Sequence, residues 1–193
     1  MNLPNKLSLL RIALIPVFAV VYLLDFAYAP LVAIGIFIIA ALTDLLDGHI
    51  ARKYNMVTNL GKLLDPIADK LLVGFALFLI AYSQMLEPKW ICTIFGAVII
   101  ARELLISMVR QVAASKGVIV QANIYGKLKT VMQTIALPIT MLLNMKTQLV
   151  AVSQVFYDVI YILAYSTLGL AVLLTIISGI VYLIQNKNVF AEA

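Results

Sequence analysis

The longest uncharged stretch of the chain is VIYILAYSTLGLAVLLTIISGIVYLIQN, residues Val159–Asn186. A helix needs about 20 mainly apolar residues to cross the hydrocarbon core of a bilayer, and this stretch exceeds that length. The whole chain has the same character, because 64% of its 193 residues are hydrophobic, only 12% are charged and the mean hydropathy is +1.06. Soluble domains carry about 25% charged residues. The sequence therefore predicts an integral membrane protein and excludes both a soluble globular domain and a disordered chain.

Shorter uncharged stretches precede this one, at Ile12–Leu24, Phe26–Thr43, Leu71–Leu86, Trp90–Ala101 and Thr130–Met145. Each becomes long enough to span a bilayer when it is extended by polar flanks that face protein. We therefore expect an all-α fold with six transmembrane helices, near residues 7–27, 30–52, 60–84, 89–114, 124–146 and 156–186. Residues 1–193 would form a single transmembrane domain.

The basic residues are distributed unevenly over this expected fold. Of the 14 lysines and arginines, only Lys89 and Lys146 would lie at the end opposite to the chain termini. Lysine and arginine concentrate on the cytoplasmic side of membrane proteins, so we expect both termini in the cytoplasm. The net charge of +5 then reflects topology and anionic lipid, and we expect no nucleic-acid partner.

The segment Asp44–Lys70 carries acids where apolar residues are expected. It holds four of the nine acidic residues, namely Asp44, Asp47, Asp65 and Asp69. The first two are three residues apart and the last two are four apart, so each pair shares one face of a helix. An isolated carboxylate at bilayer depth costs a few kcal/mol, so these groups need cations. Four converging carboxylates suit two hard divalent ions, such as Mg²⁺, Mn²⁺ or Ca²⁺.

Small and basic residues accompany these aspartates. Gly48 and Ala51 follow on the first acidic helix, and Gly61 precedes Asp65 by one turn of the second. Glycine inside a helix lowers stability by roughly 1 kcal/mol relative to alanine. We therefore interpret the two glycines as leaving room for a bulky phosphate group. Arg52 adds a planar fork of donors that matches phosphate oxygens.

The pattern Asp44-x2-Asp47-Gly48-x2-Ala51-Arg52-x8-Gly61-x3-Asp65-x3-Asp69 resembles the signature of the CDP-alcohol phosphatidyltransferases and departs from it at no defined position. The resemblance implies a six-helix membrane bundle, a homodimer, and two divalent cations, Mg²⁺ or Mn²⁺, held by the four aspartates. It also implies Asp69 as the catalytic base. The residues expected to bind the CDP-linked lipid are Gly48, Ala51, Arg52 and Gly61, together with Thr58 in the connection between the acidic helices.

Basic residues outside the signature point to an anionic second substrate. Arg102 and Arg110 are eight residues apart, roughly two helical turns along one side, and Lys127 and Lys129 open the next helix. Buried cations need an anionic partner, so we expect these four residues to bind the acceptor phosphate. Alternatives stay open, because Arg102 can pair with Glu103 and the lysines can anchor a helix at anionic lipid.

Four further stretches resemble the bacterial family members that make phosphatidylglycerol phosphate: Pro4–Arg11, Asp65–Lys70, Ile100–Ser107 and Gly126–Thr130. This resemblance implies CDP-diacylglycerol as donor, sn-glycerol 3-phosphate as acceptor and CMP as the second product. It places the protein in a bacterial cytoplasmic membrane with the active site facing the cytoplasm. Inositol phosphate, phosphatidylglycerol and serine are alternative acceptors. A cation transporter is an alternative of another class, although transport predicts acids spread through the membrane depth.

Overall fold

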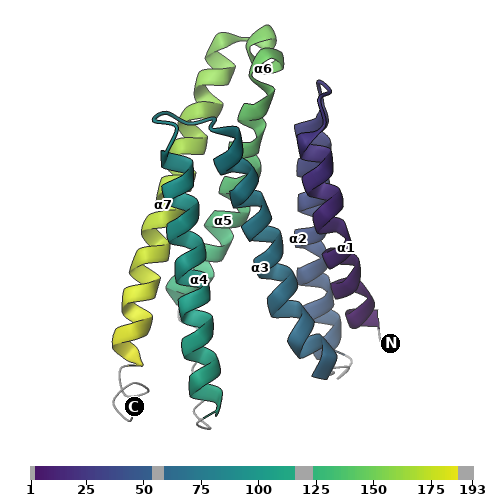
Figure 1. Ribbon diagram of the computed structural model, residues 1–193, viewed down its shortest axis with the longest axis vertical. Helices are drawn as coiled ribbons and strands as arrows, with labels where there is room; N and C mark the ends of the chain where they lie inside the picture. The colour runs from purple at the N-terminus through teal and green to yellow at the C-terminus, as the bar shows by residue number, and fades with distance from the viewer. Residues whose placement is uncertain (1–2, 54–58, 116–123, 187–193) are drawn as a thin grey trace.

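The computed structural model describes residues 3–53, 59–115 and 124–186 (Figure 1). Over these ranges the chain forms helices and their short connections, without any strand. The elements in order are α1 (Leu3–Leu23), α2 (Ala29–Lys53), α3 (Asn59–Ser83), α4 (Ile91–Ser115), α5 (Ile124–Leu142), the 3₁₀ helix η1 (Leu143–Met145), α6 (Lys146–Val152) and α7 (Gln154–Gln185). The expected all-α class is confirmed.

Most of the helices are long and apolar enough to cross a membrane. Five such segments occur within the described ranges, at Asn5–Leu23, Pro66–Ser83, Ile91–Ala114, Ile124–Val152 and Gln154–Gln185. The apolar part of α2, Ala29–Thr43, is shorter, because the charged segment begins at Asp44 while the helix continues to Lys53. A multi-pass membrane protein is therefore confirmed, and the sixth span stays a prediction.

The long helices run up and down beside one another (Figure 1). α1 begins, α2 ends, α3 begins and α7 ends at the same end of the bundle, which we call the signature end because the acidic segment lies there. α6 and the connection from α3 to α4 lie at the opposite end. The start of α1 and the end of α7 therefore lie at the same end of the bundle.

Packing divides the bundle into two groups, which are joined by α4 and by the contacts of α5 with α2 and α3. α1 packs against α2 and α3, α5 packs against α7, and α4 contacts both α3 and α7. Small side chains let the helices approach closely; the fully buried alanines include Ala33, Ala40, Ala76, Ala136 and Ala164. Aromatic contacts strengthen the first group, since the ring centroids of Phe18 and Phe37 are 5.9 Å apart.

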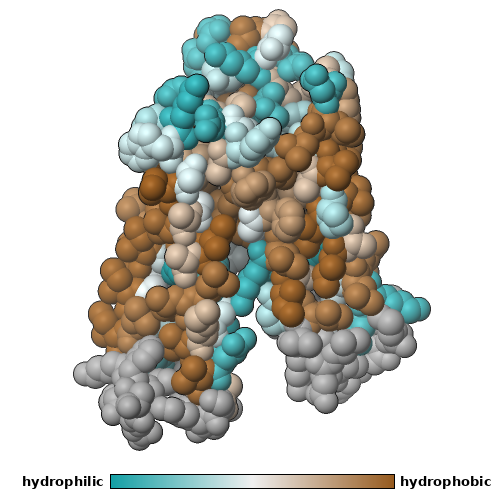
Figure 2. All heavy atoms as spheres, viewed as in Figure 1, coloured by the Kyte–Doolittle hydropathy of each residue, from teal (hydrophilic) through white to brown (hydrophobic). Residues whose placement is uncertain are grey.

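The outer surface matches a lipid environment. Large apolar side chains such as Phe78, Ile162 and Leu173 are mostly exposed along the spans. Figure 2 shows apolar side chains over the sides of the bundle, while polar ones gather at the end that carries α6. An exposed apolar surface of this extent would drive association in water, so lipid must cover it.

Candidate active site

The acidic signature lies where α2 ends and α3 begins. Asp44 and Asp47 belong to the last part of α2, and Asp65 and Asp69 to the first part of α3. α2 packs against α3, and α1 packs against both, so the two acid-bearing segments share the signature end (Figure 1). Some predicted site residues are outside what the structure describes: Thr58 entirely, and the side chains of Asp44, Asp47, Gly48, Ala51, Arg52 and Asp65. Gly61 is buried at the start of α3.

The aspartate set fits divalent cations by its chemistry and helix placement. Carboxylate oxygens are the ligands that Mg²⁺ and Mn²⁺ prefer, and all four acids lie on two adjacent helices. Among the side chains that the structure describes, no group of three or more His, Cys, Asp or Glu residues surrounds a common point. Because only one of the four signature aspartates is among those side chains, the metal site stays a prediction.

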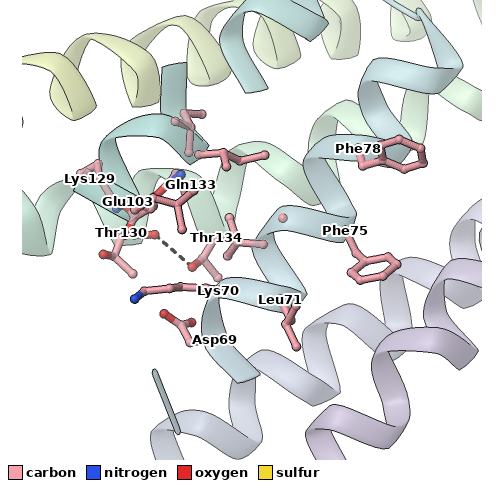
Figure 3. Close-up of a pocket in the computed structure, with 15 residues that line it drawn as sticks. Asp69, Lys70, Leu71, Phe75, Phe78, Glu103, Lys129, Thr130, Gln133 and Thr134 are labelled. Atoms are coloured by element: carbon pink, nitrogen blue, oxygen red, sulfur yellow. Dashed lines mark hydrogen bonds and ion pairs between the residues drawn. The ribbon is translucent and has the colours of Figure 1, made fainter. Parts of the chain in front are cut away.

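A cavity of about 600 Å³ lies between α3, α4 and α5 (Figure 3). Its polar lining consists of Asp69, Lys70, Glu103, Lys129, Thr130, Gln133 and Thr134. Its apolar lining consists of Leu71, Val73, Gly74, Phe75, Phe78, Ile99, Ile100 and Leu104. Asp69, the predicted catalytic base, is exposed and therefore presents its carboxylate to this space.

The two kinds of lining occupy different parts of the cavity. Figure 3 shows Glu103, Lys129 and Gln133 close together, while Phe75 and Phe78 follow one another along α3 away from them. Phe78 is 66% exposed and Leu104 is 49% exposed, so the cavity is open to the outside of the bundle. Figure 2 shows a hollow between the two helix groups toward the signature end. A molecule with a charged head and an apolar tail matches this lining.

Glu103 connects cations from two helices. Its Oε1 forms an ion pair with Nζ of Lys129 on α5 and lies 3.6 Å from Nη1 of Arg102 on α4. The Lys129 side chain is only 5% exposed. A buried ammonium is tolerated when a carboxylate compensates for its lost hydration, so Glu103 is what allows Lys129 to line the cavity.

A family model for the CDP-alcohol phosphatidyltransferases matches residues 1–185. This chain belongs to the CDP-alcohol phosphatidyltransferase family. Curated relatives carry the name CDP-diacylglycerol–glycerol-3-phosphate 3-phosphatidyltransferase. The protein from Bacillus subtilis (strain 168) is 42% identical, over 96% of this chain and 95% of its own length. The protein from Rickettsia bellii (strain RML369-C) is 37% identical over 98% and 97%, and the protein from Salmonella paratyphi A (strain ATCC 9150 / SARB42) is 44% identical over 70% and 74%.

The family prediction from the signature is thus confirmed, and the protein is a membrane-bound transferase. The four cations assigned to the acceptor lie in different surroundings within this phosphatidyltransferase. Lys129 is buried in the cavity wall, whereas Lys127 is exposed and is not part of the described lining. Arg102 and Arg110 lie on the side of α4 that contacts α7. Glu103 links Arg102 to the cavity.

Several lining residues were missed from the sequence. Thr130, Gln133 and Thr134 share the cavity wall with Lys129, and Gln133 is only 3% exposed. Lys129 and Gln133 are four residues apart and so share one face of α5. This spacing was an available signal, because polar side chains within a span mark functional positions. Gly179 and Tyr182 of α7, which contact the two arginines, carry no comparable signal.

α1 contributes a buried polar face at the signature end. Asn5, Ser8 and Arg11 are at most 4% exposed, and Nε of Arg11 donates a hydrogen bond of 3.2 Å to the carbonyl oxygen of Ala40. Ala40 is one helical turn before Asp44. From the sequence, Arg11 was counted among the basic residues of the cytoplasmic end and was given no contact of its own. The structure shows instead that it ties α1 to α2 just ahead of the acidic segment.

Proposed function

We propose that this protein transfers the phosphatidyl group of CDP-diacylglycerol to sn-glycerol 3-phosphate, giving phosphatidylglycerol phosphate and CMP. The observation that carries the proposal is the cavity in which Asp69 and the buried Lys129 share one space with the exposed Phe75 and Phe78. A lipid donor, a polar acceptor and a carboxylate base need this combination. The names of the relatives contain the same two substrates.

The donor would be held by the signature. Asp44, Asp47, Asp65 and Asp69 would bind two divalent cations, Mg²⁺ or Mn²⁺, and these supply positive charge that stabilises a pyrophosphate and a departing phosphate. Arg52 would donate to the phosphate oxygens. The small residues Gly48, Ala51 and Gly61 would leave room for the phosphates, and the Thr58 hydroxyl would add a donor. The apolar lining of the cavity would contact the acyl chains.

Asp69 would act on the acceptor. Its carboxylate takes the proton from a glycerol hydroxyl while that oxygen attacks the phosphorus that carries the diacylglycerol. A new phosphorus–oxygen bond forms, the bond to the CMP oxygen breaks, and CMP leaves with the electron pair. A carboxylate is a weak base at neutral pH, so the hydroxyl must already be held in position. Lys129 and Thr130, which share the cavity with Asp69, are placed to do this.

The charges around Glu103 favour an anionic acceptor. Arg102 and Lys129 both contact this one carboxylate, so positive charge is in excess before any substrate binds. A phosphate group would satisfy that excess, while serine, with its own ammonium, would not. Arg110 and the exposed Lys127 would extend the same positive field.

We propose the following membrane arrangement. The chain crosses a bacterial cytoplasmic membrane six times, with α2 as the sixth span and with both termini and the active site on the cytoplasmic side. Two observations support it: the basic residues concentrate at the signature end, and the relatives are bacterial. The resemblance to the family supports a homodimer.

The decisive experiment is acceptor competition with the purified protein in detergent micelles. CDP-diacylglycerol and Mg²⁺ are supplied with labelled glycerol 3-phosphate, and CMP release is measured along with label in the lipid phase. We expect both products in equal amounts, and both lowered at least about a hundredfold in an Asp69→Asn control. CMP release only with inositol phosphate, phosphatidylglycerol or serine would overturn the acceptor assignment, and no release with any acceptor would overturn the reaction.

A further inference from the structure

The end of α7 near α4 carries a buried polar face. Thr175, Ser178, Gly179 and Tyr182 follow at the spacing of one helix face, and their side chains are at most 2% exposed where they have one. The hydroxyl groups of Thr175 and Ser178 donate to carbonyl oxygens of α7 itself, at 2.6 Å and 3.0 Å. They are therefore satisfied within the helix. Gly179 and Tyr182 lie on the same face and contact the two arginines of α4.

Gly179 provides the space for the side chain of Arg102. A Cβ atom at position 179 would lie 3.3 Å from Cγ of Arg102 and 3.9 Å from its Nε. The arginine stem therefore passes directly over the backbone of α7. An alanine would push the stem by a few tenths of an ångström and would redirect the guanidinium at its end. Glycine keeps this path open although it lowers helix stability.

Tyr182 provides a surface for Arg110. Cζ of Arg110 lies 6.0 Å from the centroid of the Tyr182 ring, within the range of a cation–π interaction. The ring is 2% exposed and packs with Ile106 and Val109 of α4, so it is a fixed support. Its Oη has no hydrogen-bond partner among the residues that the structure describes, whereas buried tyrosine hydroxyls normally have one.

The charge balance at this junction leaves room for an anion. Arg102, Arg110 and Lys129 bring three positive charges. Against them stand two carboxylates: that of Glu103, which pairs with Arg102 and Lys129, and that of Asp69, which shares the cavity with Lys129. The buried Nε of Arg102, like the Tyr182 hydroxyl, has no hydrogen-bond partner in the described part of the chain. Two unused buried donors beside surplus positive charge match the oxygens of a phosphate group.

We propose that Gly179 and Tyr182 are positioning residues through which α7 directs Arg102 and Arg110 toward the phosphate of the acceptor. This inference rests on the proposed function, since it takes glycerol 3-phosphate as the anion. It gives the last helix a role beyond crossing the bilayer: α7 would hold the two arginines of α4 in position. Neither residue touches the reacting atoms, so their effect should appear in acceptor binding and not in the chemical step.

The test compares Tyr182→Leu, Tyr182→Phe and Gly179→Ala in steady-state assays with both substrates varied. Tyr182→Leu removes the ring and should raise KM for glycerol 3-phosphate about two- to fivefold, the effect of one cation–π contact. Tyr182→Phe retains the ring and should restore most of the affinity. KM for CDP-diacylglycerol and kcat should stay at the wild-type values. Tyr165→Leu, at an exposed tyrosine of the same helix, is the matched control.

Gly179→Ala tests the contact between the α7 backbone and the Arg102 side chain. It is independent of Tyr182, so the proposal can still be refuted if Tyr182→Leu does not fold. It should raise KM for glycerol 3-phosphate, yet have no further effect in an Arg102→Ala background, because the crowded side chain is then absent. Gly169→Ala is the matched control, since a Cβ there has no neighbour within 4 Å. An active wild type whose KM for glycerol 3-phosphate is unmoved by Gly179→Ala would overturn this inference alone. A wild type that consumes no glycerol 3-phosphate would overturn the proposed function itself.

Discussion

The Glu103–Lys129 ion pair gives the sharpest test of how α4 and α5 are arranged. The side chain of Lys129 is 5% exposed and that of Glu103 is 25% exposed. Replacing Glu103 by glutamine keeps the shape of the side chain but leaves the buried Lys129 ammonium without its ion-pair partner. The neighbouring Arg102, 3.6 Å from the same oxygen, loses its counter-charge in the same substitution.

The size of the effect follows from burial. Removing one partner of a buried ion pair costs about 3–5 kcal/mol. Water reaches a quarter of Glu103, so we expect the lower end of that range, about 3 kcal/mol. For a protein of this length about 1 kcal/mol lowers Tm by 2–4 °C, which gives an expected decrease of about 6–12 °C. Lys129→Met in the Glu103→Gln background removes the isolated charge and should recover most of the loss.

The assay can use the only cysteine of the chain. Cys92 lies in α4 and is 1% exposed, so a thiol-reactive fluorophore labels it only as the bundle unfolds. The labelling midpoint is compared among the wild type, both single variants and the double variant, in one detergent. Glu87→Gln is the control, because Glu87 is an exposed glutamate in the connection between α3 and α4, away from the signature end. The reasoning is refuted if Glu103→Gln unfolds at the wild-type temperature, or if the losses of the two single variants simply add.

Three further outcomes are expected. Asp69→Asn should lower kcat by about 10²–10⁴, the contribution of a general base, as measured by CMP release; near-normal turnover would remove Asp69 from that role. Excess EDTA should abolish CMP release and added Mg²⁺ or Mn²⁺ should restore it, since the aspartates need a divalent cation to bind the donor; activity that resists chelation contradicts this. Arg11→Met removes the buried donor of the hydrogen bond to Ala40 and should lower the free energy of unfolding by about 1.5–3 kcal/mol. The midpoint temperature of Cys92 labelling should fall accordingly. A midpoint equal to that of the wild type would contradict the role of Arg11 in holding α1 against α2.

Composition was sufficient to predict the helices, and the errors lie at their ends. The first helix was expected near residues 7–27 and runs from Leu3 to Leu23. The prediction followed apolar content, whereas helices continue through polar residues such as Asn5 when these are buried against neighbouring helices. The short α6 was missed, because seven residues are too few for a hydrophobic period to be recognised. Ser153, in an extended conformation, separates it from α7.

The family could be predicted from the sequence because its signature is local: eight residues at fixed spacing along two neighbouring helices. The surroundings of the acceptor cations were not readable. The contact of Glu103 with Lys129 and that of Arg102 with Gly179 join residues far apart in the chain. They depend on how α4 packs against α5 and α7, and no local pattern encodes that packing. Gly179 is one of nine glycines and has no distinguishing neighbour in the sequence.

The cavity opens beside Phe75 and Phe78, and this affects how the rate of turnover depends on the concentration of the lipid donor. Withdrawing an acyl chain of roughly 16 carbons into water would cost about 12 kcal/mol at about 0.8 kcal/mol per methylene. A site that opens sideways avoids this, because the chains stay in the hydrocarbon phase and only the headgroup moves. Encounter then becomes a two-dimensional search within one leaflet. Saturation should follow the mole fraction of donor in the micelle or bilayer, so diluting it with inert lipid will slow turnover while its bulk molarity is unchanged.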